Sequence, residues 1–60
     1  MNIEHKNILI IEDERNLSRT LAQALRLGSN GGYEVDVCDT GEQALVRLHE
    51  KKYDLVVSDL

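Results

Sequence analysis

Apolar and polar residues follow one another in blocks along the chain, and the first blocks predict a strand and a helix. The run Ile8 to Ile11 is apolar at every position, which is typical of a strand covered on both faces of a parallel sheet. After Glu12 to Arg15, apolar residues recur at helical spacing, which predicts a helix that ends near Leu27. Its apolar stripe consists of Leu17, Leu21, Ala24 and Leu25.

The second half of the chain repeats this order. Residues 33–38 alternate between apolar and polar, which predicts an edge strand with one buried and one wetter side. The apolar side holds Tyr33, Val35 and Val37. Thr40 and Gln43 form a capping-box pattern at the start of a second helix, and the run from Tyr53 to Leu60 predicts a third strand. The stripe of the second helix consists of Ala44, Leu45 and Leu48.

The predicted order of elements is therefore β-α-β-α-β, which defines an α/β fold. Helical crossovers between strands favour a parallel sheet with right-handed connections. No residues follow the third strand in the sequence to cover it, so we expect an open sheet edge and about half of a domain.

Composition narrows the class of protein. With 42% hydrophobic and 30% charged residues in 60, the chain is typical of one small globular domain. A net charge of −4 argues against binding nucleic acid through a basic surface. The longest aliphatic run is far shorter than the roughly 18 residues of a membrane span, and no signal peptide is recognisable, so we expect a cytoplasmic protein. The single cysteine, Cys38, is expected to be a packing residue.

Three carboxylates follow predicted strands. Glu12 and Asp13 come directly after the first strand, and Asp59 comes near the end of the third. The carboxyl ends of parallel strands share one rim of the sheet, so these side chains meet if the two strands are neighbours. A hard cation such as Mg²⁺ would relieve their repulsion. Beside such a cation, Asp59 could act as a nucleophile that forms an aspartyl phosphate.

Three segments carry a resemblance to a known family. Ile8 to Glu14, Gly41 to Leu45 and Tyr53 to Leu60 together resemble the first half of a bacterial response-regulator receiver domain. The resemblance implies a truncated flavodoxin-like (CheY-like) receiver fold with parallel strands in the order 2-1-3. It also implies that residues 1–60 are the N-terminal part of a single receiver domain, without its fourth and fifth strands and the helices after them.

The same resemblance implies a function in two-component signalling. Asp59 would be the phosphoacceptor, taking a phosphoryl group from a sensor histidine kinase or a phosphotransfer protein. Mg²⁺ would be held by Glu12, Asp13 and Asp59, with Asp13 as a direct ligand and Glu12 acting through water. Such a domain is not an enzyme with a separate substrate, although the complete domain catalyses its own phosphorylation and dephosphorylation.

Parts of the family's site lie beyond this sequence. The family also uses a backbone carbonyl two residues after the phosphoacceptor, a hydroxyl residue after the fourth strand and a lysine after the fifth. The sequence ends at Leu60, which would instead place an α-carboxylate close to Asp59. We therefore expect this chain to accept phosphate poorly and to associate with itself through the open sheet edge.

Other interpretations of the same residues remain open. Asp59 could cap a helix, and the acidic turn from Glu12 to Glu14 could serve a helix dipole, with Glu14 as a cap or surface residue. The main functional alternative is a receiver-like binding or assembly module without phosphoryl chemistry, whose third strand pairs with another chain. An aspartate-nucleophile phosphatase fits less well, because in that class the nucleophile follows the first strand.

Several residues carry no predicted function. The segment Gly28 to Gly32 follows a helix and enters a strand, which is the reverse of a phosphate-binding loop. His5 and His49 lie among polar residues, so we expect both to be solvated.

Overall fold

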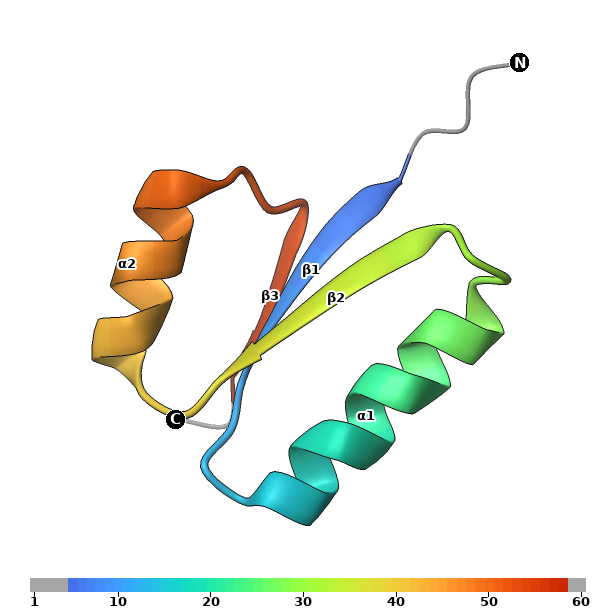
Figure 1. The fold of residues 1–60 in the computed structure, drawn as a ribbon, viewed down its shortest axis with the longest axis horizontal. Helices are drawn as coiled ribbons and strands as arrows, with labels where there is room; N and C mark the ends of the chain where they lie inside the picture. Colours follow the sequence, from blue (N-terminus) through green and yellow to red (C-terminus); the bar gives the residue numbers. More distant parts are fainter. Residues whose placement is uncertain (1–4, 59–60) are drawn as a thin grey trace.

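A parallel sheet with one helix on each face forms the molecule (Figure 1). The computed structural model describes residues 5–58. Its elements are β1 (Lys6–Ile11), α1 (Arg15–Gly28), β2 (Tyr33–Cys38), α2 (Gly41–Glu50) and β3 (Leu55–Ser58). The predicted β-α-β-α-β order is confirmed.

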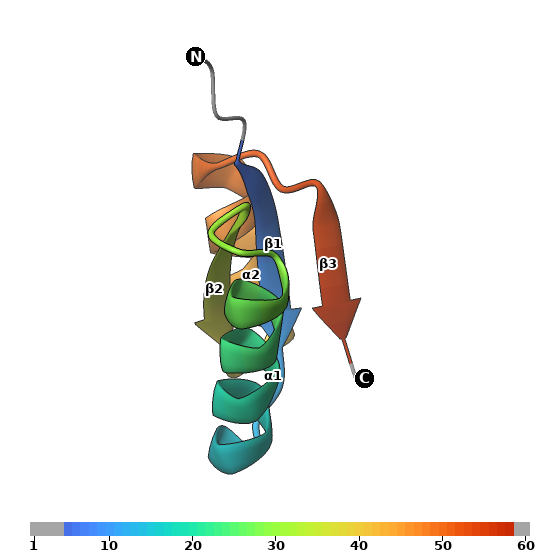
Figure 2. The same ribbon diagram turned by 90° about the vertical axis from the view of Figure 1, so that its right-hand side faces the viewer.

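The sheet has the order β2-β1-β3, with both pairs of strands parallel, and Figure 2 shows β2 and β3 on opposite sides of β1. The implied strand order 2-1-3 is therefore confirmed. Ile8 lies opposite Val35 on one side and Leu55 on the other. At the carboxyl end of the sheet, Ile11 pairs with both Cys38 and Ser58. The two outer strands thus end beside the end of β1.

The central strand β1 is buried on both faces, as its unbroken apolar run predicts. Ile8, Leu9 and Ile10 are at most 2% exposed. The face toward α1 has a core of Ile8, Ile10, Ala22 and Val35. The face toward α2 has a core of Leu9, Ile11, Cys38 and Ala44. Successive residues of β1 therefore supply two separate hydrophobic clusters.

Glu14 caps the start of α1. Its carboxylate accepts hydrogen bonds from the backbone N–H groups of Asn16 (3.1 Å) and Leu17 (2.8 Å). These N–H groups have no partner within the helix, and a negative charge at this end also suits the helix dipole. The predicted role of Glu14 as a cap is confirmed.

The buried face of α1 agrees with the predicted stripe only in part. Ser18 and Ala22 are the buried residues of the helix, whereas Ala24 is exposed and Leu17 is 42% exposed. Leu21 and Leu25 are partly buried and pack against the core on this face, as predicted. The hydroxyl of the buried Ser18 has a hydrogen-bond partner, because its Oγ donates to the carbonyl of Arg15 (3.0 Å).

The predicted division of β2 into one buried and one wet side is wrong. Val35 is buried toward α1, but Cys38 is buried toward α2 and Tyr33 is 38% exposed. The strand has helices on both faces, so each face has one buried position. Cys38 is a packing residue as predicted, and burial raises the pKa of its thiol. Arg26 donates to the backbone carbonyl of Val35 (2.8 Å) and so ties α1 to this edge strand.

The start of α2 has half of the predicted capping box. Thr40 Oγ1 accepts from the backbone N–H of Gln43 (3.2 Å), but Gln43 Oε1 accepts from the N–H of Asp39 (2.8 Å) instead of that of Thr40. The predicted stripe is also wrong at two positions, because Leu45 is 61% and Leu48 is 43% exposed. Within residues 5–58, only Ala44 of α2 is buried against the sheet.

β3 is an edge strand of the described sheet, with apolar side chains exposed on both faces. Leu55 is 51% and Val56 is 41% exposed. The prediction of an open edge is confirmed for this part of the chain. No helix among residues 5–58 is both long and apolar enough to cross a membrane.

A polar network ties the connection between α2 and β3 to β2. Lys51 Nζ lies 3.0 Å from Glu34 Oε1 and 3.1 Å from Asp36 Oδ2. The hydroxyl of Tyr53 donates to the same Asp36 oxygen (2.5 Å). The hydrogen bond from Tyr53, followed by that from Lys51, lowers the pKa of Asp36 against the opposing effect of burial.

The stability that this network contributes should be lost in acid, below about pH 4. A carboxyl group whose pKa is lowered by folding stabilises the folded state above its unfolded pKa, and this contribution disappears as the pH falls through the folded pKa. Tyr53→Phe removes the main cause of the lowered pKa of Asp36. We expect the variant to cost about 1 kcal/mol of unfolding free energy at about pH 7, and clearly less at about pH 3.

Urea unfolding of both proteins at the two pH values measures this effect. Tyr33→Phe is the matched control, because Tyr33 is 38% exposed and lies at the start of β2. The control should differ little from the wild type at either pH. A cost of Tyr53→Phe that stays constant with pH would contradict the prediction.

Candidate functional site

An acidic turn follows β1 at the carboxyl end of the sheet. The backbone N–H of Glu12 donates to the carbonyl of Cys38 (3.0 Å), so the turn is tied to the end of β2. Glu12 is only 7% exposed, and its Oε2 accepts from the N–H of Glu14 (3.0 Å). Asp13 is exposed. The start of α1 and the end of β2 therefore hold the backbone of this turn in place.

The end of β3 lies beside this turn. Ser58 is the register partner of Ile11, the residue directly before Glu12. Asp59, the predicted phosphoacceptor, lies outside the described residues, so its predicted approach to Glu12 and Asp13 stays a prediction. Within residues 5–58, no group of three or more His, Cys, Asp and Glu residues could hold a metal ion. Two of the three predicted metal ligands, Glu12 and Asp13, are thus placed on one turn.

The donor atoms of the turn fit a hard divalent cation. Glu12 and Asp13 offer carboxylate oxygens, which Mg²⁺ prefers together with water. Glu12 is oriented by its bond to the N–H of Glu14, whereas the exposed carboxylate of Asp13 can reach a hydrated ion. These two residues therefore carry donor atoms of the kind that a magnesium site uses.

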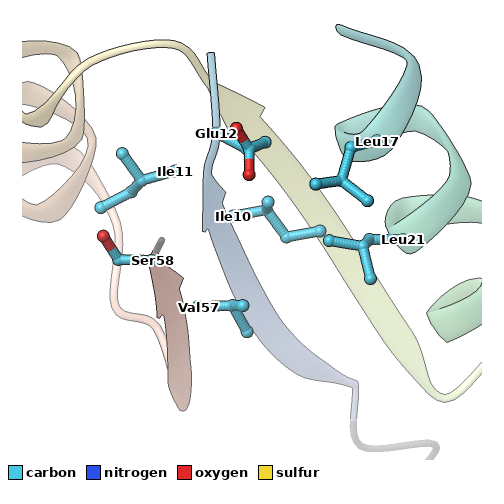
Figure 3. A pocket seen from close by; sticks show the side chains of 7 residues that line it. All are labelled: Ile10, Ile11, Glu12, Leu17, Leu21, Val57 and Ser58. Atoms are coloured by element: carbon cyan, nitrogen blue, oxygen red, sulfur yellow. The ribbon is translucent and has the colours of Figure 1, made fainter. Parts of the chain in front are cut away.

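A pocket of about 210 Å³ opens between α1 and the carboxyl ends of β1 and β3 (Figure 3). Its lining is mainly apolar, with Glu12 and Ser58 as the polar members. The full lining consists of Ile10, Ile11, Glu12, Leu17, Leu21, Val57 and Ser58. The pocket could not be predicted from sequence, because the helical spacing of Leu17 and Leu21 indicates an apolar face but not how completely the sheet covers it.

The other chemically interesting residues lie away from the acidic turn or are exposed. His5 and His49 are both exposed, as predicted. The loop between α1 and β2 contains Asn30 (φ 54°) and Gly31 (φ 87°), which adopt left-handed backbone conformations that suit asparagine and glycine. This loop enters the amino end of β2, opposite the rim that carries Glu12, so it does not contribute to the site.

Curated proteins with similar sequences are bacterial regulators. Response regulator ArlR of Staphylococcus haemolyticus is 41% identical over 54 residues, which cover 90% of this chain and 23% of that protein. Response regulator receiver protein CpdR of Brucella abortus is 36% identical over 55 residues, or 92% of this chain and 43% of that protein. Regulatory protein VanRB of Enterococcus faecalis is 34% identical over 53 residues, which cover 88% of this chain and 23% of that protein.

The chain spans less than half the length of each of these relatives. No solved structure matches it at a significant level. The family model of the response regulator receiver domain matches residues 8–60, which include all five elements except the first two residues of β1. With this match and the parallel β2-β1-β3 sheet, the chain belongs to the response regulator receiver domain family.

Proposed function

We propose that this chain is the phosphoacceptor segment of a two-component response regulator. Asp59 would take a phosphoryl group from a sensor histidine kinase or a phosphotransfer protein, with Mg²⁺ as the cofactor. The observation that carries this proposal is the parallel pairing of β1 with β3, which ends with Ile11 opposite Ser58. Glu12 and Asp13 follow one of these paired residues in the sequence, and Asp59 follows the other.

The proposed reaction is a displacement at phosphorus. A carboxylate oxygen of Asp59 forms a bond to the phosphorus of a phosphohistidine, the bond from phosphorus to the imidazole nitrogen breaks, and the nitrogen keeps the electron pair. The product is an aspartyl phosphate. Mg²⁺, when bound, would neutralise charge on the transferred group.

Each residue of the turn has a proposed part in holding the cation. Asp13 would bind it directly, and Glu12 would bind it through water. The hydrogen bond from the N–H of Glu14 to Glu12 Oε2 limits the freedom of the Glu12 carboxylate, which supports a positioning part for Glu14. The third proposed ligand is Asp59, which would combine metal binding with nucleophilic attack.

The proposed role is that of a signalling domain that supports its own phosphorylation and dephosphorylation, and not that of an enzyme with a separate substrate. We propose that it works in the cytoplasm, where kinase domains of sensor proteins would reach it. Family membership supports this role. As a further proposal, residues 1–60 are the N-terminal part of one receiver domain, which the exposure of Leu55 and Val56 on β3 supports.

Intact mass spectrometry tests the proposal. The full-length protein, incubated with Mg²⁺ and a small phosphodonor, should gain one phosphoryl group. Addition of a chelator of divalent cations should reduce this gain strongly. A full-length protein that gains no phosphoryl group in the presence of Mg²⁺ would remove the proposed mechanism.

A second candidate function is a receiver-like assembly module without phosphoryl chemistry. The exposed apolar side chains of Leu55 (51%) and Val56 (41%) on the edge strand favour it, because an open strand edge can pair with another chain. On this account the 60-residue chain associates with itself. Sedimentation velocity would then show dimers or larger species, whereas a stable monomer would contradict the assembly role.

A further inference from the structure

The side chains of β3 specify only weakly how this strand aligns with β1. A slip of one residue turns every side chain of a strand to the other face, so register is strongly specified where one face of a strand is buried and the other is not. Leu55 and Val56 point to opposite faces of the sheet, and they are 51% and 41% exposed. Val57 is partly buried and packs against the core on the face toward α1, so it is the one aliphatic residue of β3 that favours a register. A shift of one residue would exchange similar aliphatic side chains between the two faces. An interaction outside the aliphatic side chains of β3 is therefore needed to fix the register firmly.

Three hydrogen bonds to Asn7, near the start of β1, supply such an interaction. The backbone N–H of Asn7 donates to Asp54 Oδ2 (2.8 Å), and the N–H of Asp54 donates to the carbonyl of Asn7 (2.7 Å). The side-chain amide of Asn7 donates to the carbonyl of Lys52 (3.1 Å). Asp54 directly precedes β3, so this contact fixes the point at which the strand begins.

The segment that connects α2 to β3 is also bonded to β2, on the other side of β1. Lys51 binds Glu34 and Asp36, and Tyr53 binds Asp36. These contacts place the connection across the sheet, but they involve residues further from β3 than Asp54. Asn7 and Asp54 are therefore the pair that aligns β3 directly with β1.

We propose that Asn7 and Asp54 set the register of β3 against β1 and thereby act as positioning residues for the phosphoacceptor site at the opposite end of these strands. This inference rests on the proposed function. The register Ile8 to Leu55, Ile10 to Val57 and Ile11 to Ser58 brings the end of β3 beside the acidic turn.

The physical basis is the fixed length of an extended strand. Each residue of a strand advances by about 3.3 Å, so a slip of one residue would move the end of β3 by this distance along β1 and turn its side chains to the other face. Phosphoryl transfer depends on the placement of the reacting atoms, and a misplacement of about 1 Å can already slow a reaction strongly.

Three variants of the full-length protein test this role. Asp54→Ala removes the acceptor for the N–H of Asn7, whereas Asp54→Asn keeps a side-chain oxygen at the same position. Thr40→Ala is the matched control, because it removes a side-chain hydrogen bond at the start of α2, away from β3. Two quantities are measured for each protein. One is the initial rate of phosphoryl gain from a small phosphodonor, and the other is the NMR contact between the backbones of Ile10 and Val57.

We expect Asp54→Ala to lower the rate at least fivefold and to weaken the contact between Ile10 and Val57. Asp54→Asn should restore both quantities, and Thr40→Ala should leave both within about twofold of the wild type. Should Asp54→Ala not fold, Asp54→Glu replaces it with the same expectation, since its carboxylate is displaced by one methylene group.

Retention of both rate and contact in the tested Asp54 variant would overturn the inference, and so would a change in only one of them. If the wild type gains no phosphoryl group, the proposed function fails. In that case the NMR contact alone decides the register assignment. Its loss in Asp54→Ala supports the assignment, and its persistence overturns it.

Discussion

Asp59→Asn should abolish the gain of a phosphoryl group in the full-length protein. A carboxylate oxygen is a nucleophile, whereas the neutral amide of asparagine is a poor one and also a weaker ligand for Mg²⁺. We expect the intact mass of the variant to remain unchanged under conditions in which the wild type gains one group. The change is nearly isosteric, so the fold should be retained, which a circular dichroism spectrum checks.

Asp39→Asn is the matched control for this variant. Asp39 directly follows β2 and is exposed, so the same chemical change is made at the carboxyl end of a neighbouring strand. Its phosphoryl gain should equal that of the wild type. An equal gain in Asp59→Asn would show that another residue accepts the phosphoryl group and would remove the proposed mechanism.

Leu9→Ala should cost about 3 kcal/mol of unfolding free energy, since truncation of a buried leucine removes its transfer free energy and leaves a cavity. Leu9 is 0% exposed. It packs with Ile11, Cys38 and Ala44 on the face toward α2, and Tyr53 also contacts this cluster. Ala44 is the single buried residue of α2 in the described structure, so the variant should also loosen this helix.

Urea unfolding of the full-length protein, followed by circular dichroism, measures this cost. Leu27→Ala is the matched control, because Leu27 is 72% exposed near the end of α1. We expect the control to change the unfolding free energy by less than about 0.5 kcal/mol. If Leu9→Ala and Leu27→Ala lowered the unfolding free energy by similar amounts, this would contradict the burial of Leu9 in its cluster.

The acidic turn could be predicted from sequence, but its surroundings could not. Glu12 and Asp13 directly follow an unbroken apolar run, and this position alone places them at the carboxyl end of a buried strand. The bond from the N–H of Glu14 to Glu12 depends on how the chain enters α1. The pocket beside Glu12 is lined by residues of β1, α1 and β3 together, which the spacing of Leu17 and Leu21 along the chain does not reveal.

The errors in the helices have a common cause. A helical period shows that a helix has an apolar face, but the neighbouring elements decide which residues of that face are buried. Ser18 is buried in α1 although it is polar, because its hydroxyl bonds to the carbonyl of Arg15. Leu45 is 61% exposed in α2 although it is apolar, because nothing among residues 5–58 covers it.

By itself, the sequence determined the five elements, their order and the position of the acidic turn, since these follow from periodicity, capping residues and strand ends that are local in the chain. Only the tertiary structure decided the helix faces and the alignment of β3, which depend on contacts between distant residues. The bond between Asn7 and Asp54 joins residues 47 positions apart. A local pattern cannot encode such a contact, because the similar aliphatic residues Leu55, Val56 and Val57 specify the register of β3 only weakly.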